Sequence, residues 1–198
     1  MSIHVRIYLQ KIVYYTVWTK LVRMEKEQMK TVFTIDQDLI DKWTEYAKNN
    51  DLKFHREYGF LAEDVIYRSR GLPEKDLNHM VKDKGWDYKN EAGQKIDIKC
   101  TNRQRFSEFQ FTDAFWTIRD HFEDPEIEEP DYYLFTKIDI DAKKLVVIGY
   151  MPFEEAIHKS TFIEEGTYMT EYRRPSDYDL YIIYHHQIPT EYRFQFEE

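Results

Sequence analysis

The stretch that decides the fold consists of Trp86-Asp87-Tyr88, the turn Glu91-Ala92-Gly93-Gln94, and Lys95-Ile96-Asp97-Ile98-Lys99-Cys100. Polar and apolar residues alternate on both sides of the turn, and this pattern predicts a β-hairpin with Gly93 at its turn. Successive side chains of a strand point to opposite faces, so Asp97 and Lys99 are expected on one face as neighbours.

The residues before the hairpin repeat at helical spacing. Apolar residues recur at three- and four-residue steps from Thr34 to Asn50, including Ile35, behind a Thr/Asp cap. A second stripe runs from Phe54 to Arg70, where Gly71 and Pro73 follow. We expect two helices, the first ending near Asn50.

The residues after the hairpin return to strand patterns. Phe106–Phe111 is interpreted as an extension of the sheet, and a helical or irregular stretch is expected from there to the acidic run 123–131. Two buried strands, a short helix and one more strand are then expected, at Tyr132–Phe135, Leu145–Ile148, Phe153–Lys159 and Tyr178–Tyr184. Helices followed by strands predict an α/β or α+β domain with a central mixed β-sheet flanked by helices.

Length and composition limit the class of protein. The chain has 198 residues, of which 42% are hydrophobic and 17% aromatic, so it can bury enough surface to fold as one domain. Its net charge of −9 argues against a protein that coats nucleic acid by charge alone. From Lys53 to Arg105, however, twelve Lys or Arg stand against nine Asp or Glu. This local charge of +3 predicts a basic face around the hairpin.

The N-terminal residues are expected to lie outside the domain. We expect an appendage of uncertain role at residues 1–30 and a single domain at 31–198, with its core at 54–150. Ile3–Val22 is apolar but interrupted by charged and polar residues, so neither a signal sequence nor a membrane span is expected. The single cysteine, Cys100, cannot form an internal disulfide, which favours a cytoplasmic location.

The hairpin also brings together residues suited to metal-assisted chemistry. Across the turn, Asp87 can approach Asp97, and two carboxylates at a sheet edge suit a divalent cation such as Mg²⁺. A lysine beside that ion can orient or help deprotonate a bound water that attacks a phosphodiester. An Asp two residues before a Lys occurs four times in the chain, but only Asp97-Ile98-Lys99 lies on a predicted strand that follows a turn and a second acid.

At these residues the chain resembles the PD-(D/E)xK nuclease superfamily, which has the restriction-endonuclease-like fold. Gly85-Trp86-Asp87 lies where the family has Pro-Asp, although the proline is missing, and Asp97-Ile98-Lys99 matches its acid, hydrophobic residue and lysine. Glu63, within Gly59–Glu63, fits the acid of the preceding helix. The resemblance covers about half of the chain, from Phe54 to Tyr150.

The resemblance implies a nuclease that hydrolyses DNA with Mg²⁺ or Mn²⁺. It assigns Asp87, Asp97 and the Ile98 carbonyl to the metal, Glu63 to the metal directly or through water, and Lys99 to the attacking water. Glu57 is an alternative to Glu63. DNA is the expected partner, RNA is less favoured, and a homodimer stays open.

Less specific interpretations compete with these assignments. Asp97 and Lys99 also fit a surface ion pair of little energy, Asp87 fits an acid at a strand edge, and Glu63 fits an ordinary helix-surface residue. The negative net charge favours a second hypothesis, a non-catalytic protein of this fold that binds nucleic acid or inhibits a protein partner. Cys100 is expected to be a small buried hydrophobic residue rather than a nucleophile.

A few other basic residues and histidines lie at positions that suggest a role. Arg103, Arg105 and Lys89 are candidates for contacts with nucleic acid, although isolated basic residues more often only solvate a surface. Because adjacent residues on a strand point to opposite faces, His185 and His186 are not expected to share a metal.

Overall fold

The computed structural model describes residues 31–52, 56–72, 85–102, 114–119, 127–169 and 174–194. The chain divides into two compact units, Met1–Thr31 and Val32–Glu198, and the elements below belong to the second. The expected N-terminal appendage and the expected strand Phe106–Phe111 lie outside the described residues.

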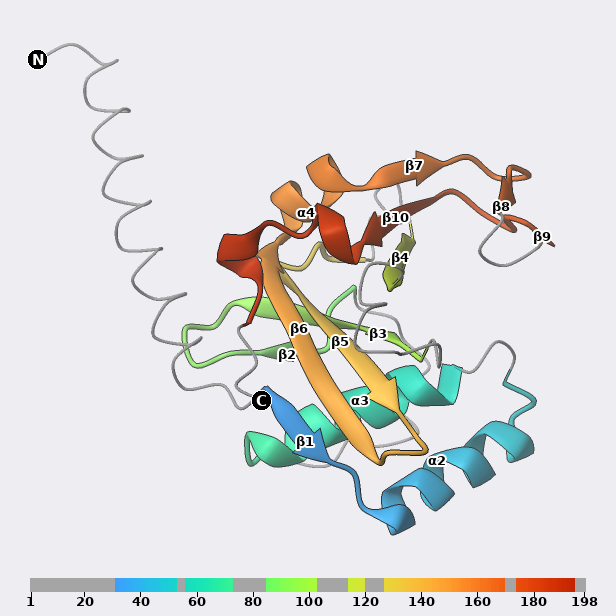
Figure 1. Ribbon diagram of the computed structural model, residues 1–198, viewed down its shortest axis with the longest axis vertical. Coiled ribbons are helices and arrows are strands. Elements are labelled where there is room, and N and C mark those ends of the chain that lie inside the picture. Colours follow the sequence, from blue (N-terminus) through green and yellow to red (C-terminus); the bar gives the residue numbers. More distant parts are fainter. Residues whose placement is uncertain are drawn as a thin grey trace, which may run out of the picture. The chain divides into compact units, whose positions relative to one another are not determined.

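A five-stranded sheet in the order β1-β6-β5-β3-β2 organises the second unit (Figure 1). Strands β3 and β5 are parallel, whereas the other neighbours are antiparallel, so the sheet is mixed. The apolar runs expected to be buried on both faces form the centre of the sheet as β5 and β6. The bounds are β1 Val32–Thr34, β2 Tyr88–Lys89, β3 Lys95–Thr101, β5 Tyr132–Asp139 and β6 Lys144–Pro152.

The predicted hairpin is confirmed as β2 and β3. Tyr88 pairs with Ile96, and Gly93 occupies the turn at a φ of +79°, a conformation that glycine adopts without strain. The side chain of Asn90 closes the loop, because its Oδ1 accepts hydrogen bonds from the backbone amides of Ala92 and Gln94.

Three α-helices are present among the described residues: α2 Gln37–Asn49, α3 Arg56–Ser69 and α4 Phe153–Lys159. All three predicted helices are confirmed, but the first begins later than expected. Val32–Thr34 is a strand, and the backbone amide of Ile35 donates to the carbonyl of Lys143 before α2 starts. α2 packs on α3, where the rings of Trp43 and Phe60 lie 5.4 Å apart.

A second sheet, in the order β4-β10-β7, packs beside the first and contains β4 Phe115–Arg119, β7 Thr161–Ile163 and β10 Leu180–Tyr184. The strand expected at Tyr178–Tyr184 is therefore confirmed, with a later start. The helical or irregular stretch expected after Phe111 is wrong at β4, because these residues pair with distant β10. A two-stranded ribbon joins β8 Tyr168–Met169 to β9 Arg174–Pro175.

The two faces of the large sheet have different coverings. Helix α3 packs on the face of Tyr88 and Ile96, since the rings of Tyr67 and Tyr88 lie 6.0 Å apart. The opposite face presents Tyr133 and Phe135 to an apolar cluster contributed by β4, β10 and α4. The two sheets are also joined by the indole of Trp116, which donates to the Thr136 carbonyl at 2.7 Å, beside a bulge in the β5–β6 ladder.

The described residues thus form a mixed α/β fold with a curled mixed sheet, as the order of predicted elements indicated. Among these residues, none of the helices combines the length and hydropathy needed to cross a membrane.

Candidate functional site

The centre of the candidate site is an ion pair on β3. Nζ of Lys99 lies 2.8 Å from Oδ2 of Asp97, which confirms that the two side chains are neighbours on one face of the strand. Their side chains are 25% and 13% exposed, respectively, so solvent and a ligand can reach the pair although most of its surface is covered.

Aromatic side chains of β5 line this face. Tyr133 is the register partner of Asp97, and its ring centroid lies 5.5 Å from Nζ of Lys99, within the range of a cation–π contact. Burial, and then the negative charge of Asp97, raise the pKa of the Tyr133 phenol well above its ordinary value, so the phenol stays protonated. The ring thus restricts where the Lys99 ammonium can lie.

Asp87 immediately precedes β2 and is bound to β3 through backbone and side chain. Its amide donates to the Ile96 carbonyl at 2.8 Å, and its Oδ2 accepts from the Ile98 amide at 2.7 Å. Tyr67 of α3 donates its hydroxyl hydrogen to the Asp87 carbonyl. Within a strand the N–H and C=O of one residue point to the same edge, so the Ile98 carbonyl also faces the side of Asp87. The structure therefore brings Asp87 and the Ile98 backbone together, one residue from Asp97.

Glu63 approaches β3 from the other side. It lies on α3, is only 8% exposed, and is close enough to Cys100 for its charge to contribute to the raised pKa of the thiol. Cys100 and the Asp97–Lys99 pair occupy opposite faces of β3, since alternate residues of a strand do so. Glu57, the alternative acid, lies in the first turn of α3. Within the described ranges, no three His, Cys, Asp or Glu side chains form a group that could hold a metal.

Cys100 is a partly buried free thiol. Burial is the main cause that raises the pKa of Cys100 to about 12, so the thiol is protonated at neutral pH. A protonated thiol is a weak nucleophile, in agreement with the predicted packing role.

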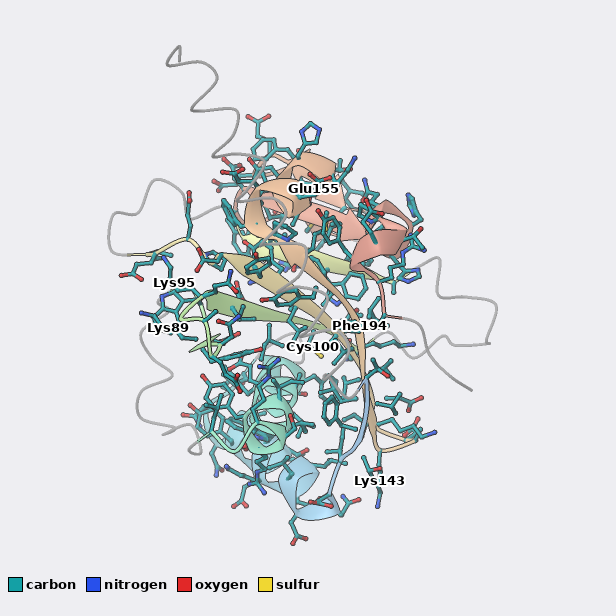
Figure 2. All side chains as sticks on the ribbon, turned by 90° about the vertical axis from the view of Figure 1, so that its left-hand side faces the viewer. Lys89, Lys95, Cys100, Lys143, Glu155 and Phe194 are labelled. Carbon is teal, nitrogen blue, oxygen red and sulfur yellow. The ribbon has the colours of Figure 1, made fainter. Side chains whose placement is uncertain are left out.

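Of the three candidate residues for nucleic-acid contacts, the structure describes Lys89. Lys89 is exposed on β2, beside its register partner Lys95 (Figure 2), and its Nζ lies 5.3 Å from the ring centroid of Trp86. The Trp86 indole is anchored to Glu128, to which it donates at 3.0 Å. Arg103 and Arg105 lie outside the described residues.

His185 and His186 belong to a short 3-10 helix, His185–Gln187, rather than to the expected strand. Burial, followed by the charges of Arg193 and His186, lowers the pKa of His185 to about 4, so this imidazole is neutral at physiological pH. The ring of His186 stacks on that of Tyr184 at 5.6 Å. These contacts give both residues a packing role.

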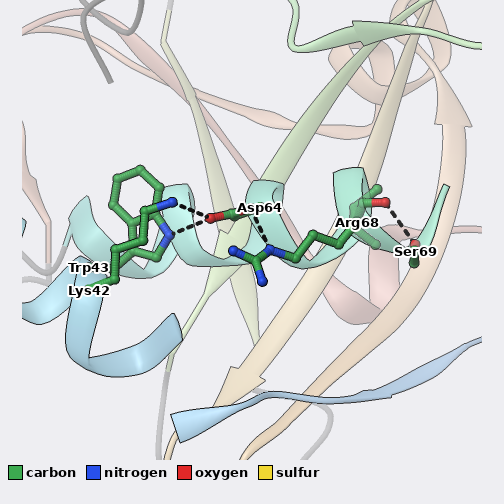
Figure 3. A network of polar contacts seen from close by, with 6 residues as sticks. Lys42, Trp43, Asp64, Arg68 and Ser69 are labelled. Atoms are coloured by element: carbon green, nitrogen blue, oxygen red, sulfur yellow. Dashed lines mark hydrogen bonds and ion pairs between the residues drawn. The ribbon is translucent and has the colours of Figure 1, made fainter. Parts of the chain in front are cut away.

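Sequence reasoning missed two buried charged residues. Asp64, on α3, accepts hydrogen bonds from Nζ of Lys42 at 3.1 Å, Nε1 of Trp43 at 3.0 Å and Nε of Arg68 at 3.2 Å (Figure 3). Lys137, on β5, is 5% exposed. Spacing alone marks neither position, because Asp64 lies beside Glu63 on the helix and Lys137 follows the apolar run Tyr132–Phe135 that predicts the strand.

No model of a known protein family matches the chain, and a search of curated proteins finds no similar sequence.

Proposed function

We propose that this protein is a divalent-metal-dependent nuclease that hydrolyses phosphodiester bonds in DNA and has a restriction-endonuclease-like fold. The observation that carries the proposal is the Asp97–Lys99 pair on β3, next to the Asp87 carboxylate that binds the Ile98 amide across the hairpin. The helix, hairpin and parallel strand in this order agree with the resemblance to the PD-(D/E)xK superfamily. The single cysteine is in keeping with a cytoplasmic location, and a homodimer remains a prediction.

The donor atoms present suit Mg²⁺ or Mn²⁺. The carboxylates of Asp87 and Asp97 and the carbonyl of Ile98 are hard oxygen ligands; Asp87 binds the Ile98 amide, and Asp97 directly precedes Ile98 on β3. Mg²⁺ is commonly held by one or two carboxylates, with waters and substrate phosphates completing its octahedron, and does not need an all-protein cage. When bound, such an ion stabilises negative charge on the phosphate and makes a bound water more acidic. Glu63 would act on the ion through water, because it lies on the other face of β3.

The protein's own groups have separable roles in this proposal. The Lys99 ammonium orients the attacking water and stabilises the charge that develops on the phosphate oxygens. Asp97 holds that ammonium at 2.8 Å, while the Tyr133 ring beneath it limits its movement. The hydrogen bond from Ile98 fixes the Asp87 carboxylate at the strand edge, so its position is set before the substrate arrives.

The chain contains its own matched control for a cleavage assay. Asp141 and Lys143 repeat the Asp-x-Lys spacing in the exposed turn between β5 and β6. Linear and circular DNA incubated with Mg²⁺ or Mn²⁺ should be cut by the wild type, while Asp97→Asn and Lys99→Gln lose about 100-fold or more in rate. Asp141→Asn and Lys143→Gln should cut within about twofold of wild type. Absence of cutting by the wild type with either metal, or normal cutting by the site variants, would overturn the proposal.

One observation favours the second hypothesis, a nucleic-acid-binding protein without turnover. Asp97 and Lys99 already neutralise each other, and the Asp87 carboxylate already accepts a backbone hydrogen bond, so these groups also serve the fold. This hypothesis expects DNA binding without cleavage, equal DNA affinity in wild type and Asp97→Asn, and no change of melting temperature with Mn²⁺. A rise in melting temperature with Mn²⁺ that Asp97→Asn abolishes would contradict it.

A further inference from the structure

Two exposed aromatic side chains lie on the strands that follow α4. Among the described residues, the large hydrophobic side chains that are exposed are those of Val32, Phe162 and Tyr168, and the last two are 48% and 60% exposed. Single exposed apolar residues are normal on a protein surface, whereas apolar side chains that share a face mark interaction sites. The arrangement of Phe162 and Tyr168 on their strands therefore decides what they can bind.

Strands β7 and β8 run beside β10 and β9 and form one two-stranded ribbon (Figure 1). Ile163 pairs with Leu180, and Tyr168 pairs with Pro175, so the same number of residues separates the two pairs on each side, 164–167 and 176–179. Backbone hydrogen bonds join the two sides between these pairs. Phe162 and Tyr168 thus lie on the same side of one ribbon, six positions apart.

Both aromatic side chains point away from the buried face of this ribbon. Ile163 and Met169 pack in one apolar cluster with residues of β10. Because successive side chains of a strand point to opposite faces, the residues that precede them, Phe162 and Tyr168, lie on the other face. The Phe162 ring lies 5.2 Å from that of its register partner Tyr181. Six residues of extended chain span about 22 Å at most, which limits the separation of the two exposed rings.

The chain between the two rings is acidic. Glu164 and Glu165 are exposed, and exposed Asp179 lies beside them, because its Oδ1 accepts a hydrogen bond from the Glu165 amide at 2.7 Å. Arg174 is the one basic residue in the described parts of 161–184, and it pairs with Asp177. Within those parts of the chain, the other three carboxylates have no basic partner, so the ribbon keeps a negative charge between its exposed rings.

The combination of carboxylates and aromatic rings selects the chemistry of a partner. Its negative charge disfavours the phosphates of nucleic acid and the anionic headgroups of a membrane. A guanidinium group fits both features, because it pairs with a carboxylate through two parallel hydrogen bonds and also stacks on aromatic rings. An ammonium group pairs with the same carboxylates only as a point charge.

We propose that Phe162, Glu164, Glu165, Tyr168 and Asp179, here called the ribbon surface, bind an arginine-rich segment of a partner protein. An extended segment presents every second side chain to the same side, about 6.6 Å apart, so a few alternate arginines can reach from one ring to the other. Arginines at the two ends stack on the rings, and those between them pair with the carboxylates. The inference goes beyond the proposed nuclease and does not rest on it, because none of these residues belongs to the proposed metal site.

The test measures binding of a fluorescein-labelled peptide of alternating Arg and Ser to the full chain, by fluorescence anisotropy at physiological ionic strength. The double variant Glu164→Gln and Glu165→Gln should raise Kd about fivefold or more, as expected for two lost charge pairs at a surface. Tyr168→Leu should raise Kd about threefold, whereas Tyr168→Trp keeps the aromatic face and should bind at least as tightly as wild type. A peptide of alternating Lys and Ser carries the same charge and should bind the wild type about threefold more weakly.

A matched control separates the ribbon surface from the net charge of the protein. Asp38→Asn with Glu45→Gln removes the same two charges from exposed positions of α2 and should leave Kd unchanged. Equal weakening by this pair and by the Glu164 and Glu165 pair would mean that net charge alone holds the peptide, and would overturn the inference. A wild type that does not bind the Arg peptide, or an unchanged Kd in Tyr168→Leu, would also overturn it.

Two further measurements complete the test. The ring NMR signals of Tyr168, assigned by their loss in Tyr168→Leu, should shift when the Arg peptide is added to the wild type, and unshifted signals would refute the inference even if a variant failed to fold. Wild type and Tyr168→Leu are also compared with a DNA duplex and with anionic lipid vesicles, to which their affinities should be equal. Binding of either that Tyr168→Leu abolishes would assign the ribbon surface to that partner and overturn the choice of an arginine-rich segment.

Discussion

Replacing Asp87 by Asn and by Ala separates what this residue does for the fold from what it does for a metal. Its Oδ2 accepts the Ile98 amide at 2.7 Å, and Ile98 is only 5% exposed. Asn keeps a side-chain oxygen at the same reach, so Asp87→Asn should change the free energy of unfolding by less than about 0.5 kcal/mol. Ala removes the acceptor, and Asp87→Ala should lose about 1–2 kcal/mol, the usual result for a partly buried hydrogen bond to a charged group.

Metal affinity should follow a different pattern. Both substitutions remove the negative charge, so both should weaken Mn²⁺ binding, measured by calorimetry, by at least about tenfold, or 1.4 kcal/mol. Stability is read from urea unfolding of the same samples. Equal losses of stability in Asn and Ala variants would mean that the charge itself supports the fold. Wild-type Mn²⁺ affinity in both variants would remove Asp87 from the proposed metal site.

Three further predictions concern stability. Asp64→Ala should lower the free energy of unfolding by about 2–3 kcal/mol, because it leaves the buried Trp43 indole without its hydrogen-bond acceptor. Asp41 is exposed, so the control Asp41→Ala should change the free energy of unfolding by less than about 0.5 kcal/mol. Equal urea midpoints for the two variants would contradict this prediction. Gly85→Ala should lower the free energy of unfolding by about 3 kcal/mol, because Gly85 has a φ of +80° and a Cβ there would lie 2.1 Å from a backbone oxygen. Gly93 has a φ of +79° but open space around it, so Gly93→Ala should lower the free energy of unfolding by only about 1 kcal/mol. A larger loss for Gly93→Ala than for Gly85→Ala would refute this explanation. Above about pH 7, Lys137 loses its proton in the folded chain but keeps it in the unfolded chain, because burial lowers its pKa from 10.5 to about 7 in the fold. Between about pH 7 and pH 10.5, the free energy of unfolding of the wild type should therefore rise with pH relative to that of Lys137→Met. Parallel pH profiles of the two proteins would contradict that pKa shift.

Local patterns account for the elements that the sequence predicted well. The hairpin follows from alternation and one glycine, and α4 occupies the predicted range Phe153–Lys159, because both depend on neighbours in the chain. β4 was missed because its strand conformation depends on pairing with β10, about 65 residues further along. β1 ends at Thr34, three residues before α2 begins, so the helical spacing that starts at Thr34 places the start of the helix too early.

The candidate site could be predicted where one strand defines it. Alternation on β3 is enough to bring Asp97 and Lys99 together, and the ion pair confirms it. The side from which Glu63 approaches depends on which face α3 covers, and no periodicity within the helix contains that information. The alignment of Lys137 with Thr101 requires the β3–β5 register, which is set by strands more than 30 residues apart.

The two-residue length of β2 has a consequence for the edge of the large sheet. β2 forms one edge of the large sheet, and at Ile98 the strand is already replaced by the Asp87 carboxylate. An uncovered edge amide is a template on which a strand from another molecule can add, and charged side chains at edges prevent this. The Asp87 carboxylate therefore occupies, at Ile98, an edge amide on which such a strand could add.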